Sequence, residues 1–148
     1  MYLDKYQLKT EENFTRFEFI SEGSNGTIRK LIEFQQTIDT DTFNLAFGDK
    51  DPVTGGLDDL AVSSNGDTQR VLATVVAAVY TFLEKHRTAY VYAQGSTKAR
   101  TRLYRMGISR FYEEMKKDFY LYGRIGDNFF EYKPGIEYEG FLAQRKFH

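Results

Sequence analysis

Residues 71–93, VLATVVAAVYTFLEKHRTAYVYA, decide the fold, because the hydrophobic pattern changes its period within them. Leucine and valine side chains first recur at helical spacing, at positions 72, 75, 76, 79 and 83, which marks one apolar face of a helix. This predicts a helix from about Gly66 to Lys85, with Asn65 or Asp67 able to cap its start. The period then falls to two in residues 89–93, which predicts a strand.

Before this stretch the sequence alternates in the manner of an antiparallel sheet. Phe17 and Phe19 alternate with polar residues, and Ile32 and Phe34 do so after the turn-rich segment 21–26, which predicts a β-hairpin. Residues 43–47 form a third candidate strand. A short fourth strand is expected at residues 60–63, after the loop 48–59.

After the stretch, the turn 94–97 leads into a second helix with Ala99, Leu103 and Met106 on its apolar face. Gly107 is expected to break or bend it, with a further helical piece over residues 109–117. Residues 119–124, 128–133 and 138–146 are strand candidates. The fold class predicted is α+β, in the order β-β-β-(β)-α-β-α-β-β-(β): a mixed, mostly antiparallel sheet with two main helices packed on it, in a single domain over residues 1–148.

Composition excludes several classes of function. Lys and Arg total 20 against 21 Asp and Glu, a net charge of −1, so no global field attracts nucleic acid or a membrane surface. There is no cysteine, which excludes disulfides and thiolate chemistry. The longest apolar stretch, Val71–Leu83, is shorter than the ~20 residues that span a bilayer, and no secretory signal is visible. We expect a soluble, cytoplasmic protein with no membrane association.

The start of the second helix is the main candidate site. Its ligand-binding candidates are Gly95, Ser96, Thr97, Lys98, Arg100, Arg102 and Arg105, because a strand that turns into a helix presents unpaired N–H groups beside these cations. At helical spacing Lys98, Arg102 and Arg105 share one stripe. An anionic small molecule, nucleic acid or an acidic protein would fit, although a plain solvated helix face explains the stripe equally simply. Tyr90, Tyr92 and Tyr104 are either stacking surfaces or core residues.

Two conformations of Gly95 are open on the sequence alone. A positive φ would explain the glycine through backbone geometry, whereas ordinary β dihedrals would mean that a neighbouring backbone packs closely against it.

Other chemistry has weaker support. Asp49, Asp51, Asp58 and Asp59 provide oxygen ligands suited to Mg²⁺ or Ca²⁺, but aspartate is common in turns and the loop lacks the EF-hand pattern, so no metal and no cofactor are predicted. His86 is interpreted as a favourable residue at the end of the first helix and not as part of a catalytic triad.

Two resemblances extend these expectations. The segments FGD (47–49), SNGD (64–67), VLATV (71–75) and GSTKARTRLYR (95–105) resemble an uncharacterised family of small bacterial proteins. The order of elements over residues 14–108 is similar to that of the GCN5-related N-acetyltransferases. That likeness implies a loop that cradles the coenzyme A pyrophosphate at the start of the first helix, and Tyr104 as a general acid. The loop here reads NGDTQR, with one glycine and a carboxylate.

The leading hypothesis is therefore an interaction module that binds an anion at residues 95–105. The alternatives are an acyl-CoA-dependent N-acyltransferase with a degenerate cofactor loop, and a structural homodimer that pairs through Phe129, Phe130 and Tyr132.

Overall fold

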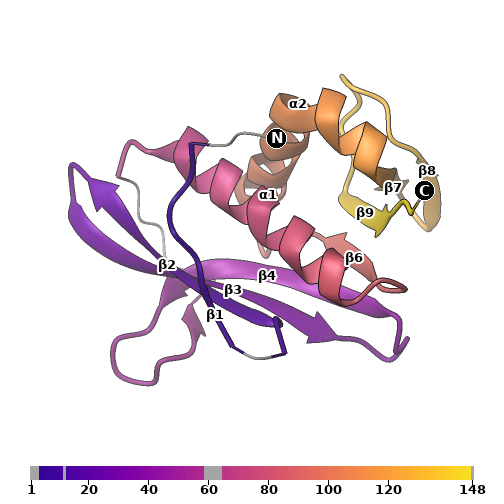
Figure 1. Cartoon of the computed structure of the whole chain (residues 1–148). Coiled ribbons are helices and arrows are strands. Elements are labelled where there is room, and N and C mark those ends of the chain that lie inside the picture. The colour runs from indigo at the N-terminus through magenta and orange to yellow at the C-terminus, as the bar shows by residue number, and fades with distance from the viewer. Residues whose placement is uncertain (1–3, 12, 59–64, 148) are drawn as a thin grey trace.

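The computed structural model describes residues 4–11, 13–58 and 65–147. Within these residues two helices pack on one sheet of nine strands (Figure 1). The elements in chain order are β1 (Lys9–Thr10), β2 (Arg16–Gly23), β3 (Gly26–Gln36), β4 (Thr42–Lys50), β5 (Leu57–Asp58), α1 (Thr68–Lys85), β6 (Tyr90–Ala93), α2 (Lys98–Asp118), β7 (Phe119–Ile125), β8 (Asn128–Glu131) and β9 (Gly140–Arg145).

The strand order across the sheet is β1-β2-β3-β4-β6-β9-β7-β8, with β5 paired to β4 beside this path. Every described pair is antiparallel except β4 with β6, which run parallel from Thr42↔Tyr90 to Leu45↔Ala93. The predicted α+β class and element order are thus confirmed. The two-residue strand β1 was not predicted, since Lys9 and Thr10 carry no alternation.

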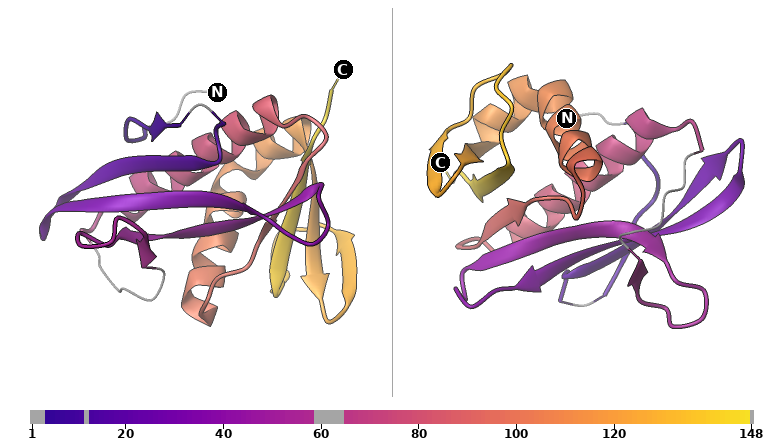
Figure 2. Two further views of the ribbon diagram at one scale, coloured as in Figure 1. Left: turned by 90° about the horizontal axis from the view of Figure 1, so that it is seen from below. Right: turned by 180° about the vertical axis from the view of Figure 1, so that it is seen from behind.

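Both helices lie on the same side of the β2–β3–β4 part of the sheet (Figures 1 and 2). The buried face of α1 packs on the inward side chains of these strands. Phe82 of α1 is completely buried and stacks on Phe34 of β3 with ring centroids 4.2 Å apart, a burial that contributes roughly 1.5–3 kcal/mol. Val91 and Ala93 of β6 point to the same core, so Tyr90 and Tyr92 point to the outer face of the sheet.

The second helix differs from the prediction. It spans Lys98 to Asp118 with a kink at Phe111, whose dihedrals are not helical (φ −108°, ψ 17°). The expected interruption of the helix is therefore present, but it lies at Phe111 and not at Gly107. A Cβ added to Gly107 would lie 3.5 Å from the Leu72 side chain, so this glycine sits in the contact between the two helices. The fourth strand expected at residues 60–63 lies outside the described residues.

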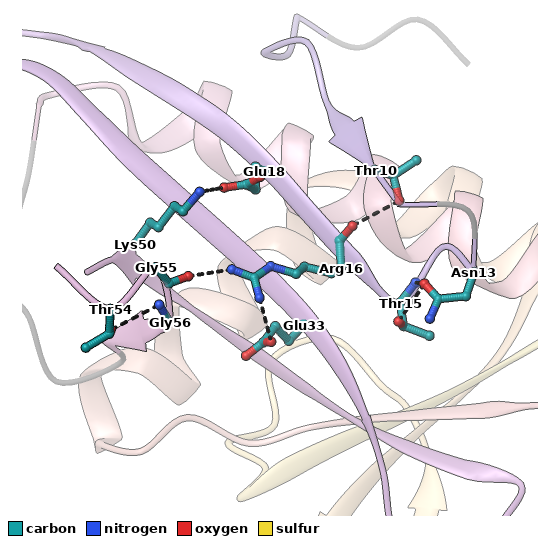
Figure 3. A network of polar contacts seen from close by, with 10 residues as sticks. All are labelled: Thr10, Asn13, Thr15, Arg16, Glu18, Glu33, Lys50, Thr54, Gly55 and Gly56. Carbon is teal, nitrogen blue, oxygen red and sulfur yellow. Dashed lines mark hydrogen bonds and ion pairs between the residues drawn. The ribbon is translucent and has the colours of Figure 1, made fainter. Parts of the chain in front are cut away.

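The loop between β4 and β5 lies on the outer side of the sheet, away from the helices (Figure 1). Figure 3 shows how polar side chains hold it there. Arg16 of β2 donates to the carbonyl of Gly55 and pairs with Glu33 at 3.9 Å, and Lys50 pairs with Glu18.

In the described part of the chain, neither helix is long and apolar enough to cross a membrane.

Candidate functional site

The start of α2 follows β6 after a short turn that is held by its own side chains. Thr97 is the N-cap residue, and its hydroxyl accepts a hydrogen bond from the Arg100 amide at 3.1 Å. The Gly95 amide donates to the Thr101 hydroxyl at 2.9 Å. These contacts satisfy part of the helix start and fix the path of residues 94–97.

Of the two alternatives that the sequence leaves open for Gly95, the structure has the close packing and not the positive φ. Gly95 does not belong to the glycines with positive φ. A Cβ at this position would lie 2.4 Å from the Arg100 Cβ and 2.5 Å from the Thr101 backbone nitrogen. Only a residue without a side chain lets the turn pass so close to the helix.

Lys98, Arg102 and Arg105, here called the basic stripe, line a cleft of about 620 Å³, here called the α2 cleft. Its walls are residues 94–98, 101, 102 and 105 of the turn and helix, together with Arg124 and residues 137–139. Lys98, Arg102 and Arg105 thus come together as their spacing predicts. Lys98 and Arg102 are exposed, Arg105 is partly buried, and none of the three makes a hydrogen bond or ion pair with the described residues.

The opposite wall holds Arg124 of β7, which was not predicted from the sequence. Its Nε donates to the Tyr92 hydroxyl at 2.7 Å, and another nitrogen donates to the Gln94 side-chain oxygen at 3.1 Å. The hydrogen bond to Tyr92 raises the pKa of Arg124 above its ordinary value. Glu139 lies 3.6 Å from Arg124 and accepts from the Gly126 amide. This carboxylate therefore already has partners of its own.

Arg100 lies on the other side of the turn, apart from the stripe. It donates to the carbonyl of Phe47 at 2.5 Å, and its guanidinium lies 5.2 Å from the centroid of the Phe47 ring. It lines a second cleft of about 330 Å³, the β4–β6 cleft, which also shares Gly95 and Ser96 with the α2 cleft. Tyr104 lines this second cleft and is only 6% exposed.

The start of α1 is occupied by the protein's own side chains. Asp67 is the N-cap residue but makes no side-chain cap; its carboxylate instead accepts from the hydroxyls of Tyr6 and Ser21, both at 2.6 Å. Asn65 is buried and binds the β2–β3 hairpin through its amide. This helix start does not fit a pyrophosphate, because the Asp67 carboxylate would repel it and the Asn65 amide already binds the hairpin. Arg70 is the only basic residue in the first turn of α1.

The acidic loop does not gather into a site. Asp49 pairs with Lys30 at 2.5 Å, and Asp51 accepts from the amides of residues 53 and 54, hydrogen bonds that lower the pKa of Asp51. Asp58 lies opposite Asp49 in the β4–β5 pair, and Asp59 lies outside the described residues. No three His, Cys, Asp or Glu side chains of the described part of the chain come close enough to hold a metal.

His86 lies at the C-cap of α1, as expected. Its ring stacks on Phe82 at 4.4 Å, and its Nε2 lies 2.8 Å from the carbonyl of Asn13. Both contacts give it a structural role.

Comparison of the chain with known proteins gives one match. A family model described as "Family of unknown function (DUF6934)" matches residues 2–146. The chain belongs to that family. The resemblance to an uncharacterised family is therefore confirmed, whereas the acetyltransferase resemblance stays a prediction. A search of curated proteins and a search of solved structures gave no match for this DUF6934 protein.

A second basic surface of the DUF6934 protein makes a useful contrast. Near the start of α1 a cleft of about 480 Å³ is lined by Lys30, Lys50 and Arg70, among other residues. Each of these three cations is in an ion pair, with Asp49, Glu18 and Asp4 respectively. Lys9 and Arg29 also line this second cleft, and neither forms an ion pair with the described residues. The α2 cleft differs in that no cation of its stripe, Lys98, Arg102 or Arg105, is paired with a carboxylate of the described chain.

Proposed function

We propose that this DUF6934 protein is a binding module for an anionic ligand that carries phosphate groups, and that the α2 cleft is its site. The observation that carries the proposal is the set of three cations, Lys98, Arg102 and Arg105, on one wall of a 620 Å³ cleft, without ion-pair partners among the described residues. Unpaired like charges held on one helix face repel each other, and a bound anion relieves that repulsion.

The surroundings of the cleft support a phosphate over a simple counter-ion. Arginine presents a planar fork that binds phosphate oxygens in pairs, whereas lysine acts as a point charge. Of the two carboxylates that line the cleft, Glu139 is bound by the Gly126 amide and lies beside Arg124, so only Glu137 has no partner among the described residues. We expect the chain to fold as a single domain. We also expect the protein to act in the cytoplasm, because its lack of cysteine fits a reducing compartment.

The test is a calorimetric titration of tripolyphosphate at several salt concentrations. The double variant Arg102→Gln/Arg105→Gln should weaken binding at least about tenfold, since hydrogen bonds to charged groups contribute about 1.5–3 kcal/mol each. The matched control is Arg110→Gln/Lys117→Gln, which removes the same charge from the same helix outside the cleft. Equal losses in the two double variants, or an affinity that salt does not change, would refute the proposal.

An acyl-CoA-dependent transferase is the second candidate. It is favoured by the parallel pair β4–β6, whose register ends at Leu45↔Ala93, and by the cleft with Tyr104 just beyond this point. The start of α1 argues against it, because a carboxylate and a buried asparagine stand where the pyrophosphate would lie. A thermal shift with acetyl-CoA tests it: at 100 times its Kd a ligand stabilises by about 2.7 kcal/mol, so an unchanged melting temperature at millimolar acetyl-CoA would exclude this candidate.

A further inference from the structure

Aromatic side chains gather on the outer face of the sheet beside the α2 cleft. In β6 and β7 the core residues alternate with Tyr90, Tyr92, Tyr120 and Tyr122, which therefore point outward. Phe129 of the edge strand β8 pairs in register with Arg124, so it shares this face. Its ring meets that of Tyr92 edge to face, with centroids 6.1 Å apart.

These rings border a groove of about 680 Å³, here called the aromatic groove. Tyr90, Tyr92, Tyr122, Phe129 and Leu142 line it, with the turn between β3 and β4 at one end. Phe129 is 47% exposed. Neither helix lies on this face (Figure 2), so the described part of the chain leaves these rings open to a ligand. Asp39 also borders the groove, but its oxygens accept from Asp41 and Thr42 of its own turn.

The aromatic groove and the α2 cleft meet at one pair of residues. The Tyr92 ring lines the groove, while its hydroxyl accepts from Arg124, which lines the cleft. The Tyr92 hydroxyl also donates to Gln94 of the cleft at 2.7 Å. Flat aromatic rings therefore lie directly beside a group of cations that includes the basic stripe.

We propose that the aromatic groove and the α2 cleft together bind single-stranded nucleic acid. Bases stack on Tyr122 and Phe129, and the phosphates run past Arg124 to Arg102 and Arg105. Base stacking on aromatic rings combined with a cationic path for the backbone is how single strands are bound without sequence readout. The inference rests on the proposed function, because it uses the same cations.

The other occupant to consider is a second copy of the chain that pairs along the edge strand β8. Tyr132, expected in such an interface, is only 3% exposed and packs against Tyr138 and Phe141, so it cannot contact another copy. The cations beside the groove also favour a polyanion over an identical copy, since an identical copy would bring the same positive charges to the interface.

The test uses a short fluorescein-labelled oligothymidylate and fluorescence anisotropy. Phe129→Ala should weaken binding at least about fivefold, as the loss of one stacked base does. The matched control is Phe130→Ala, which removes an equally exposed ring from the same strand but on the opposite face. The control should bind as the wild type does. Circular dichroism checks that both variants fold.

The outcomes separate this inference from the proposed function. Loss of oligothymidylate binding in Phe129→Ala, with tripolyphosphate binding unchanged, supports the inference. Tripolyphosphate binding without oligothymidylate binding, or equal affinity in both phenylalanine variants, overturns the inference and leaves the proposed function standing. Failure to bind either probe overturns both. Light scattering that shows a dimer, converted to a monomer by Phe129→Ala, would identify a second copy as the occupant and overturn the inference.

Discussion

Replacement of Gly95 by alanine should destabilise the protein although its backbone conformation is ordinary. The added Cβ would meet the Arg100 Cβ at 2.4 Å and the Thr101 nitrogen at 2.5 Å. An ordinary contact lies near 3.5 Å, so the turn and the start of α2 must separate by about 1 Å. Both obstacles belong to the backbone or lie next to it, so no side chain can simply rotate away.

The cost has two parts. Overpacking of this kind costs about 1–3 kcal/mol. The forced movement also strains the hydrogen bond from the Gly95 amide to Thr101 and the Thr97 cap, a cap being worth roughly 1 kcal/mol. We therefore expect Gly95→Ala to lower the free energy of unfolding by about 2–4 kcal/mol. Gly95→Val should be only slightly worse, because the first added carbon already collides.

Urea unfolding followed by circular dichroism measures the loss. Gly107→Ala is the matched control: its Cβ would make an ordinary 3.5 Å contact with Leu72, and alanine is favoured over glycine in a helix interior by up to about 1 kcal/mol. This control should be neutral or stabilising. If Gly95→Ala unfolds within about 0.5 kcal/mol of the wild type, the close approach of the turn to α2 is wrong.

Further predictions concern polar groups away from the cleft. Asn65→Ala should lower the free energy of unfolding by about 2–4 kcal/mol, because it removes three hydrogen bonds to the β2–β3 hairpin. Urea unfolding measures this loss, and a loss no larger than that of an exposed surface variant would contradict the prediction. Burial and a hydrogen bond to Asp118 raise the pKa of Tyr80 far above its ordinary value. The folded state therefore keeps a proton that the unfolded chain releases above about pH 10, and stability falls as the pH rises past that point. Tyr80→Phe should flatten this fall while Tyr120→Phe, at a half-exposed ring, should not; equal slopes in urea unfolding at about pH 8 and pH 11 would refute the assignment.

The pattern of apolar residues predicted the elements but not their neighbours. Alternation in residues 17–19 and 89–93 shows which side chains face the core, and the structure has strands at both places. It does not say that β6 pairs with β4 on one side and with β9 on the other, because register and partner depend on the whole sheet. The interruption of the second helix was wrongly placed at Gly107 for the same reason. This glycine lies in a contact with α1, which the sequence of α2 does not show.

The candidate site, too, was predicted only in part. The stripe of Lys98, Arg102 and Arg105 follows from helical geometry alone, so the sequence predicts it. Arg124 lies on a distant strand and reaches the cleft only through the β7–β9 register. A signal for it was present, since alternation in β7 places Arg124 on the face opposite the core. Nothing in the sequence tied that face to the turn after β6.

Both clefts exist because β6 is shorter than its neighbours. Beyond Ala93 the chain leaves the sheet toward α2, while β4 continues past Leu45 to Lys50 on one side. On the other side, residues 137–139 run beside the departing turn before β9 begins. The turn 94–97 therefore has a cleft on each flank, and Gly95 and Ser96 line both. Residues 94–96 are therefore a wall common to both clefts, with Arg100 and Tyr104 on one side of it and Lys98 and Arg102 on the other.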